Sequence, residues 1–106
     1  MNDWFAYDEG RSIGRISAEG GEILHDDGHP LGARITLKRT GKYVSISCNI
    51  YGWIDHTRFF GTILDARREY VLMKRAIDQL IEIISSGGEN DLNGWEAISE
   101  FVRRFP

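Results

Sequence analysis

The spacing of apolar residues between positions 65 and 85 is the feature that most constrains this chain. They recur at steps of three and four, with charged residues between them: Ala66, Tyr70, Met73, Ile77, Leu80, Ile81 and Ile84. This period predicts an amphipathic helix over about residues 65–85, with Thr62 as its N-cap. A long helix with one apolar face needs an apolar surface to cover, so the rest of the chain should supply a sheet.

Two runs before this helix predict that sheet. Apolar and polar residues alternate from Ala33 to Lys38 and again from Val44 to Ile50, a period of two that gives each strand one apolar face. Shorter strands are expected at residues 4–7, at 11–18 with a bulge at Gly14, and at 22–25. Two acids, two glycines and a proline predict a loop over residues 26–32.

The last dozen residues predict a second, shorter helix. Asn93 would cap it, and its apolar stripe is unusually aromatic: Trp95, Ile98, Phe101, Val102 and Phe105. This stripe should dock on the remaining core, or alternatively on another copy of the chain. We therefore expect one domain over residues 1–106, of the α+β class. It would be a two-layer fold in which one long and one short C-terminal helix pack on one face of an antiparallel meander of four to six strands.

Charge is distributed unevenly along the chain. Residues 1–30 carry seven acids and two bases, residues 31–75 carry nine bases and three acids, and the remainder is acidic again. The net charge of the whole chain is −3. This pattern favours neighbouring strands and helices whose opposite charges face one another. The acidic balance disfavours nucleic acid as a partner. Without a signal peptide or a long apolar run, the sequence predicts a soluble cytoplasmic protein without a membrane segment.

The best candidate ligand site is the polar break that follows the strand ending at Ile50. If the 26–32 loop folds beside it, His29 would join a pocket formed by Tyr51, Trp53, Asp55, His56 and Arg58. In that pocket His56 would act as general base, Arg58 as an anion clamp, and Tyr51 or Trp53 as a stacking wall. The structural alternative is that these aromatic residues complete the core.

Metal and nucleophile chemistry receive less support. His25, Asp27, His29 and His56 are the residues that could converge on a transition metal, but their spacing matches no metal motif, so no metal or cofactor is predicted. Cys48 is the only cysteine and lies on the apolar face of its strand. There a thiol is normally an inert packing group, so no catalytic residue is assigned.

Several short runs resemble a pattern shared by small uncharacterised bacterial proteins. The runs are EGG at residues 19–21, the acid-rich turn ending in His29, GARITL at 32–37, and IYGW followed by His56 and Thr57. The resemblance spans roughly residues 14–75 and implies a bacterial protein, but it brings no activity with it.

Two functional hypotheses follow. The first is a non-enzymatic protein-interaction module that acts through a sheet face, an exposed edge or the aromatic C-terminal helix, with a homodimer as one form of it. The second is a small ligand-binding protein or metal-assisted enzyme with a pocket around His29 and His56.

Overall fold

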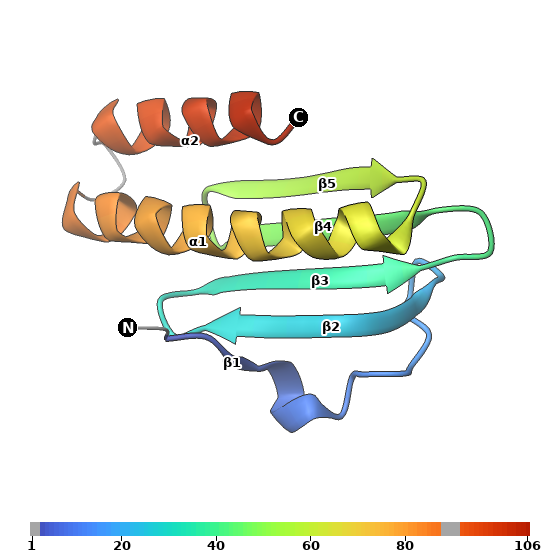
Figure 1. Cartoon of the computed structure of the whole chain (residues 1–106). Helices are drawn as coiled ribbons and strands as arrows, with labels where there is room; N and C mark the ends of the chain where they lie inside the picture. The colour runs from blue at the N-terminus through green and yellow to red at the C-terminus, as the bar shows by residue number, and fades with distance from the viewer. Residues whose placement is uncertain (1–2, 88–91) are drawn as a thin grey trace.

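The structure is a computed structural model that describes residues 3–87 and 92–106. Its centre is a five-stranded antiparallel sheet in which each strand pairs with its neighbour in sequence (Figure 1). The strands are β1 (Phe5–Ala6), β2 (Glu22–His29), β3 (Ala33–Arg39), β4 (Val44–Ile50) and β5 (Ile54–Phe60). The helices are a short 3-10 helix, η1 (Tyr7–Gly10), between β1 and β2, and two C-terminal α-helices, α1 (Ile63–Gly87) and α2 (Leu92–Arg104). The predicted α+β class is confirmed.

The core lies between α1 and the inner faces of β3 and β4. Ile35 lies opposite Cys48 and Leu37 lies opposite Ile46 in the antiparallel register, and all four side chains are buried. The helix contributes the stripe that its spacing predicted, with Met73 at its centre. The two period-two runs were predicted correctly because each of these strands has one face against the helix.

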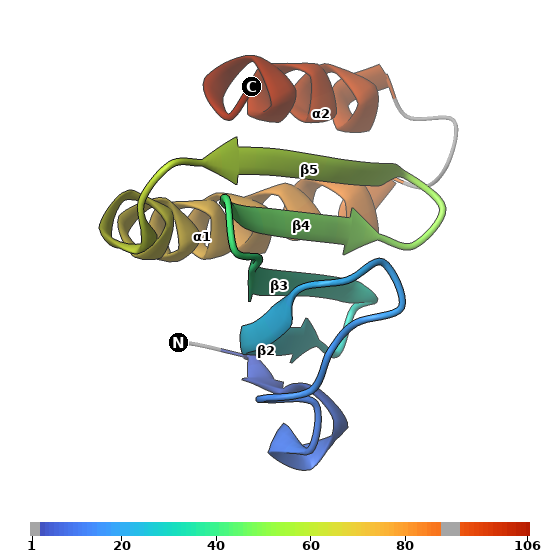
Figure 2. The ribbon, with the colours of Figure 1, turned by 90° about the vertical axis from the view of Figure 1, so that its right-hand side faces the viewer.

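Helix α1 lies across one face of the sheet but not over its centre. It begins after Thr62, whose Oγ1 accepts a hydrogen bond from the backbone N–H of Asp65 (3.2 Å), as predicted. Its closest contacts are with β3, β4 and β5, so β2 lies at the margin of the covered area. Figure 2 shows the helix behind the sheet, while no described helix covers the opposite face.

Helix α2 packs against α1, next to the β5 edge of the sheet (Figures 1 and 2). Its Ile98 and Phe101, together with Phe105 just beyond it, are buried in the same core cluster as the α1 stripe. Three residues of the predicted α2 stripe are therefore buried within their own chain, whereas Trp95 (45%) and Val102 (36%) are exposed. Neither described helix combines the length and apolarity that a membrane-spanning segment needs.

Strand β2 is longer than predicted. Residues 26–29 were expected to belong to a loop, but they continue the strand, and the turn to β3 occupies only residues 30–32. Gly28 sits in the strand because the ring of Phe5 on β1 lies where a side chain would project: an added Cβ would be 2.8 Å from that ring. The glycine that shapes the turn is Gly32, with a φ of 97°.

A bulge near the start of β2 decides which of its side chains face α1. Ile23 pairs with Lys38 but His25 pairs with Leu37, so Leu24 is an extra residue in the ladder. Because of this insertion, Ile23 and His25 point to opposite faces although they are two residues apart. His25 thereby joins the α1 side of the sheet.

Two other expectations need correction. Residues 11–18 do not form a strand: Ile16 makes a single bridge to Glu22, and positive φ angles at Gly10 and Gly14 bend the segment. The break predicted after Ile50 is a tight turn at residues 51–53. The polar run that follows is the regular edge strand β5, which can be polar because its outward side chains are exposed.

The uneven charge is resolved as the sequence predicted, by pairing across neighbouring strands. Acids of the N-terminal part face bases of β3 in three pairs: Asp26–Arg34 (2.7 Å), Glu22–Arg39 (3.3 Å) and Glu19–Lys38 (3.6 Å). Arg34 and Lys38 lie on the sheet surface remote from α1, whereas Arg39, which pairs with the core residue Val44, lies on the α1 side.

Asp26 makes the most buried of these pairs. Its side chain is fully buried, and its two oxygens accept hydrogen bonds from Nε (2.9 Å) and Nη2 (2.7 Å) of Arg34. Thr36 donates a third bond to the same carboxylate (3.0 Å). The hydrogen bond to Asp26 raises the pKa of Arg34 above its ordinary value. Three donors thus compensate an acid inside a strand.

We expect Asp26→Ala to lower the free energy of unfolding by about 2–3 kcal/mol, because Arg34 and Thr36 lose their acceptor while Arg34 keeps part of its hydration. Urea denaturation followed by circular dichroism would measure this. Glu22→Ala is the matched control, since its pair with Arg39 on the same two strands is exposed and should contribute less than about 0.5 kcal/mol. Equal losses in the two variants would contradict the role assigned to Asp26.

Candidate functional site

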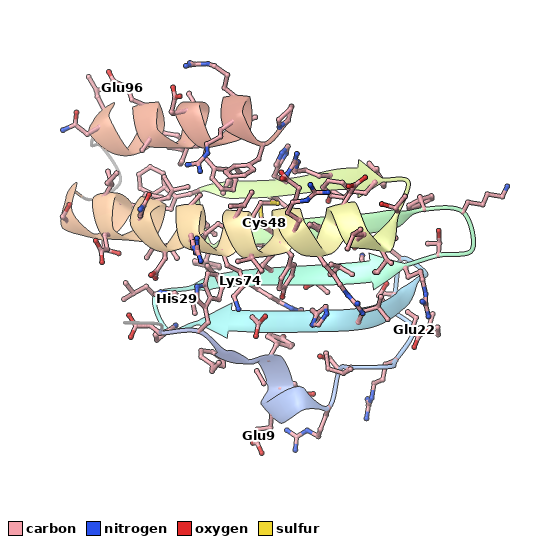
Figure 3. All side chains as sticks on the ribbon, viewed as in Figure 1. Glu9, Glu22, His29, Cys48, Lys74 and Glu96 are labelled. Carbon is pink, nitrogen blue, oxygen red and sulfur yellow. The ribbon has the colours of Figure 1, made fainter. Side chains whose placement is uncertain are left out.

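An open groove of about 830 Å³ lies between β2 and α1. The side chains that line it are mostly polar or aromatic: Trp4, His25, Asp27, Arg67, Tyr70, Val71, Lys74, Arg75 and Asp78. Figure 3 shows Lys74 on α1 and His29 at the end of β2.

The position of α1 explains why this part of the sheet is polar. On β3 the residues that face α1 are apolar, but their neighbours on β2 lie at the margin of the area that the helix covers. His25, Asp27 and His29 alternate along β2 on the side that faces the helix. Polar side chains are tolerated here because His25 is exposed, while Asp27 and His29 have polar partners on α1.

Each of these three residues meets a residue of α1. The helix offers every fourth residue, and the contacts are between His25 and Tyr70 (ring centroids 5.6 Å apart), Asp27 and Lys74 (3.3 Å), and His29 and Asp78 (2.9 Å). These side-chain pairs thus hold β2 and α1 together. Most of the paired residues also line the groove.

The carboxylate of Asp27 is already compensated within the protein. Its Oδ2 accepts a hydrogen bond from the hydroxyl of Tyr70 (2.7 Å) and a charged one from Lys74 (3.3 Å). Burial, and next the hydrogen bond to Asp27, raise the pKa of the Tyr70 phenol far above its ordinary value. Tyr70 therefore remains a neutral donor, and Asp27 does not serve as a free base.

Three basic side chains of the groove retain unused donors. Within the part of the chain that the structure describes, Arg67, Arg75 and His25 form neither an ion pair nor a side-chain hydrogen bond. All three are exposed. Because the acids of the groove already have partners, these free donors give it an excess of positive, hydrogen-bonding capacity.

His29 is a structural anchor. Its ring is buried, with 2% of the side chain exposed, and its Nδ1 accepts a hydrogen bond from the backbone N–H of Leu31 (3.2 Å). A backbone N–H can only donate, so in the neutral ring the hydrogen lies on Nε2, which donates to Asp78. His29 therefore ties the β2–β3 turn to α1.

The same tautomer argues against a metal at this position. Among residues 3–87 and 92–106, the one set of three potential ligands whose atoms lie within 4.8 Å of each other is Asp3, His29 and Asp78. A metal would need the lone pair of His29 Nε2, which would place a hydrogen on Nδ1 against the N–H of Leu31. The residues named from the sequence, His25, Asp27, His29 and His56, do not converge.

His56 and Arg58 lie at the other edge of the sheet, on β5. His56 Nε2 is 2.6 Å from the carbonyl oxygen of Phe105, and Arg58 donates to the carbonyl of Pro106 (3.1 Å) and to Glu69 on α1 (2.8 Å). Both side chains hold the segment that follows α2 against the sheet. The expected general base and anion clamp are thus engaged in structural contacts.

The remaining predicted ligand residues are dispersed. Tyr51 is in the β4–β5 turn with 86% of its surface exposed, Trp53 contacts the ring of Trp95 (4.5 Å), and Asp55 lies on the face remote from α1. The expected pocket around His29 and His56 is not formed, because β3 and β4 separate their strands by about 14 Å.

Sequence reasoning overlooked the basic residues of α1 and the aromatic ring of Trp4. The available signal was a second stripe on the helix, Arg67–Val71–Arg75, at steps of four beside the apolar one. It went unused because residues 26–29 were assigned to a loop, so the strand that faces this helix edge was not expected.

Cys48 offers no nucleophile. It is buried beneath α1 (Figure 3), and burial raises the pKa of its thiol to about 12, with a smaller contribution from Asp55. At neutral pH the thiol is therefore neutral and inaccessible. The free donors of Arg67, Arg75 and His25 suit the groove to binding an anionic group.

A scan of protein-family models finds no match to this chain, and searches of the curated proteins and of the solved structures find none either. The resemblance to small bacterial proteins stays a prediction.

We expect Cys48 to resist modification in the folded protein. At pH 8 the aromatic disulfide reagent DTNB should react with it only at the rate of unfolding, because a thiol with a pKa of about 12 supplies almost no thiolate and is shielded by the core. The same protein in 8 M urea serves as control and should react within seconds to minutes. Fast reaction of the folded protein would contradict the assigned packing role.

Proposed function

We propose that this protein is a binding module without catalytic activity, whose β2–α1 groove receives an acidic segment of a protein partner. A bacterial, cytoplasmic setting, as expected from the sequence, is part of the proposal. Binding of the partner would require no metal or cofactor.

The observation that supports this proposal is the set of unused donors at Arg67, Arg75 and His25. Guanidinium groups bind carboxylates through paired, charge-assisted hydrogen bonds, and exposed ones also accelerate encounter with an acidic partner. In other parts of the fold arginines are engaged, as Arg34 is with Asp26 and Arg58 is with Glu69. Arg15 and Arg104 also lack an ion pair among the described residues, but the groove is lined by two such arginines together.

Exposure favours a protein segment over a small molecule. Sites for small molecules usually enclose most of the ligand surface, whereas Arg67, Val71, Arg75 and His25 all lie open to solvent. Val71 is 50% exposed and adds apolar surface between the arginines. Arginine next to apolar and aromatic side chains is the usual composition of a protein-binding surface.

Nucleic acid fits the groove less well. The two acids Asp27 and Asp78 line it, and the whole chain carries a net charge of −3, so a long polyanion would meet repulsion on most of the surface. A short acidic segment can contact the arginines and avoid these acids.

We expect the double variant Arg67→Glu/Arg75→Glu to bind acidic peptide at least about tenfold more weakly than the wild type, because two attractive contacts become repulsive. The probe is a fluorescein-labelled peptide of alternating glutamate and serine, and the readout is fluorescence anisotropy at low and high salt.

Arg68→Glu is the control and is compared with Arg67→Glu alone, so that each variant changes the net charge by the same amount. Arg68 is the neighbour of Arg67 on α1 but does not line the groove. The control variant should bind the peptide nearly as the wild type does, and circular dichroism should show that all variants are folded. Equal weakening by Arg68→Glu would mean that the peptide senses only net charge, and undiminished binding by the double variant would exclude the groove.

A further inference from the structure

The spacing of alternate residues along β2 is close to the spacing of every fourth residue along α1. Two residues along a strand advance by about 6.6 Å, and four residues along a helix advance by about 6 Å. Alternate residues of β2 can therefore meet every fourth residue of α1, as they do at His25–Tyr70, Asp27–Lys74 and His29–Asp78. The chain thus contains a working example of strand-to-helix pairing by side chains.

The neighbouring row of α1 has the same spacing and no strand beside it. Arg67, Val71 and Arg75 are each four residues apart, and they lie next to the row that pairs with β2. All three line the groove and are exposed. Neither arginine has an ion-pair or hydrogen-bond partner among the described residues.

An extended segment bound in the groove would have alternate side chains spaced to meet Arg67, Val71 and Arg75. Its side chains at positions i, i+2 and i+4 point to one side and advance in steps of about 6.6 Å. The outer residues would meet Arg67 and Arg75, and the middle one would meet Val71. Carboxylates suit the two arginines, whereas an apolar side chain suits Val71.

We infer that the groove recognises an extended partner segment with acidic residues at positions i and i+4 and an apolar residue at i+2. The inference rests on the proposed function and specifies its partner. The side chains at i+1 and i+3 point away from α1, so they carry little specificity. An acid at i+2 is disfavoured, because it would lose hydration against Val71 without gaining a cationic partner.

The test compares two labelled peptides of identical composition. One carries Glu-Ser-Leu-Ser-Glu between glycine–serine flanks, and the other carries Glu-Leu-Ser-Glu-Ser, in which the two acids point to opposite sides of an extended chain. Fluorescence anisotropy with the wild-type protein should show the first peptide binding at least about fivefold more tightly.

Reversing the charges of the groove arginines and of the peptide tests which residues contact each other. The Arg67→Glu/Arg75→Glu variant should lose the glutamate peptide and gain a peptide with Lys-Ser-Leu-Ser-Lys in the same flanks. Arg75→Glu alone should prefer a peptide in which only one end is lysine, and which end it prefers gives the direction of the segment along α1.

The outcomes separate the inference from the function on which it rests. Equal binding of the two isomeric peptides, with loss of both in the double variant, would overturn the spacing rule and leave an acidic docking groove. Binding of neither acidic peptide, or binding unaffected by the double variant, would overturn both.

Discussion

The packing of the α1 stripe on β3, β4 and β5 is the contact on which the rest of the structure depends. Ile35, Leu37, Ile46 and Cys48 give these strands an apolar inner face, and the helix covers it completely. A sheet of five strands is wider than one helix. Since α1 takes its place over the apolar strands, β2 is left at its edge, and the polar residues of that strand become the wall of a groove.

Helix α2 covers the core on the β5 side of α1, opposite the groove. Phe101 and Phe105 close the core beyond β5, and His56 and Arg58 hold the chain end in place through backbone carbonyls. One margin of α1 is thereby sealed and the other is open. This asymmetry gives two histidines different neighbours: His29 meets α1, and His56 meets the segment after α2.

The sequence allowed the architecture to be predicted where one physical effect dominated. Burial of one face produced the period-two runs of β3 and β4 and the stripe of α1, and these elements were assigned correctly. The assignment failed for residues 26–29, where two acids and a glycine have the composition of a turn. Asp26 is stabilised in a strand by Arg34 and Thr36, which are distant in sequence, and Gly28 is required by the ring of Phe5. Such long-range compensation has no local signature.

The candidate site was missed for the same reason. The sequence pointed to His29 and His56 because titratable residues are conspicuous. However, the separation of these two residues in sequence does not tell which strands lie between them in the sheet. Arg67 and Arg75 were visible only as polar positions of an amphipathic helix. Their lack of partners is a property of the three-dimensional arrangement, and it becomes apparent only when the partners of the other charged residues are known.

The bulge at Leu24 has a consequence for how this molecule avoids unwanted association. A regular outer edge on β2 would offer a row of backbone groups to which any extended chain could add as a further strand, a common route to aggregation. The extra residue breaks the regular spacing of that row, the two residues of β1 pair with part of it, and Gly14 and Arg15 hydrogen-bond to the backbone of Ile23. Backbone addition is thereby discouraged on the side where the groove opens. An extended segment that approaches there must be selected by its side chains, so the protein can combine an accessible edge with discrimination among the chains that reach it.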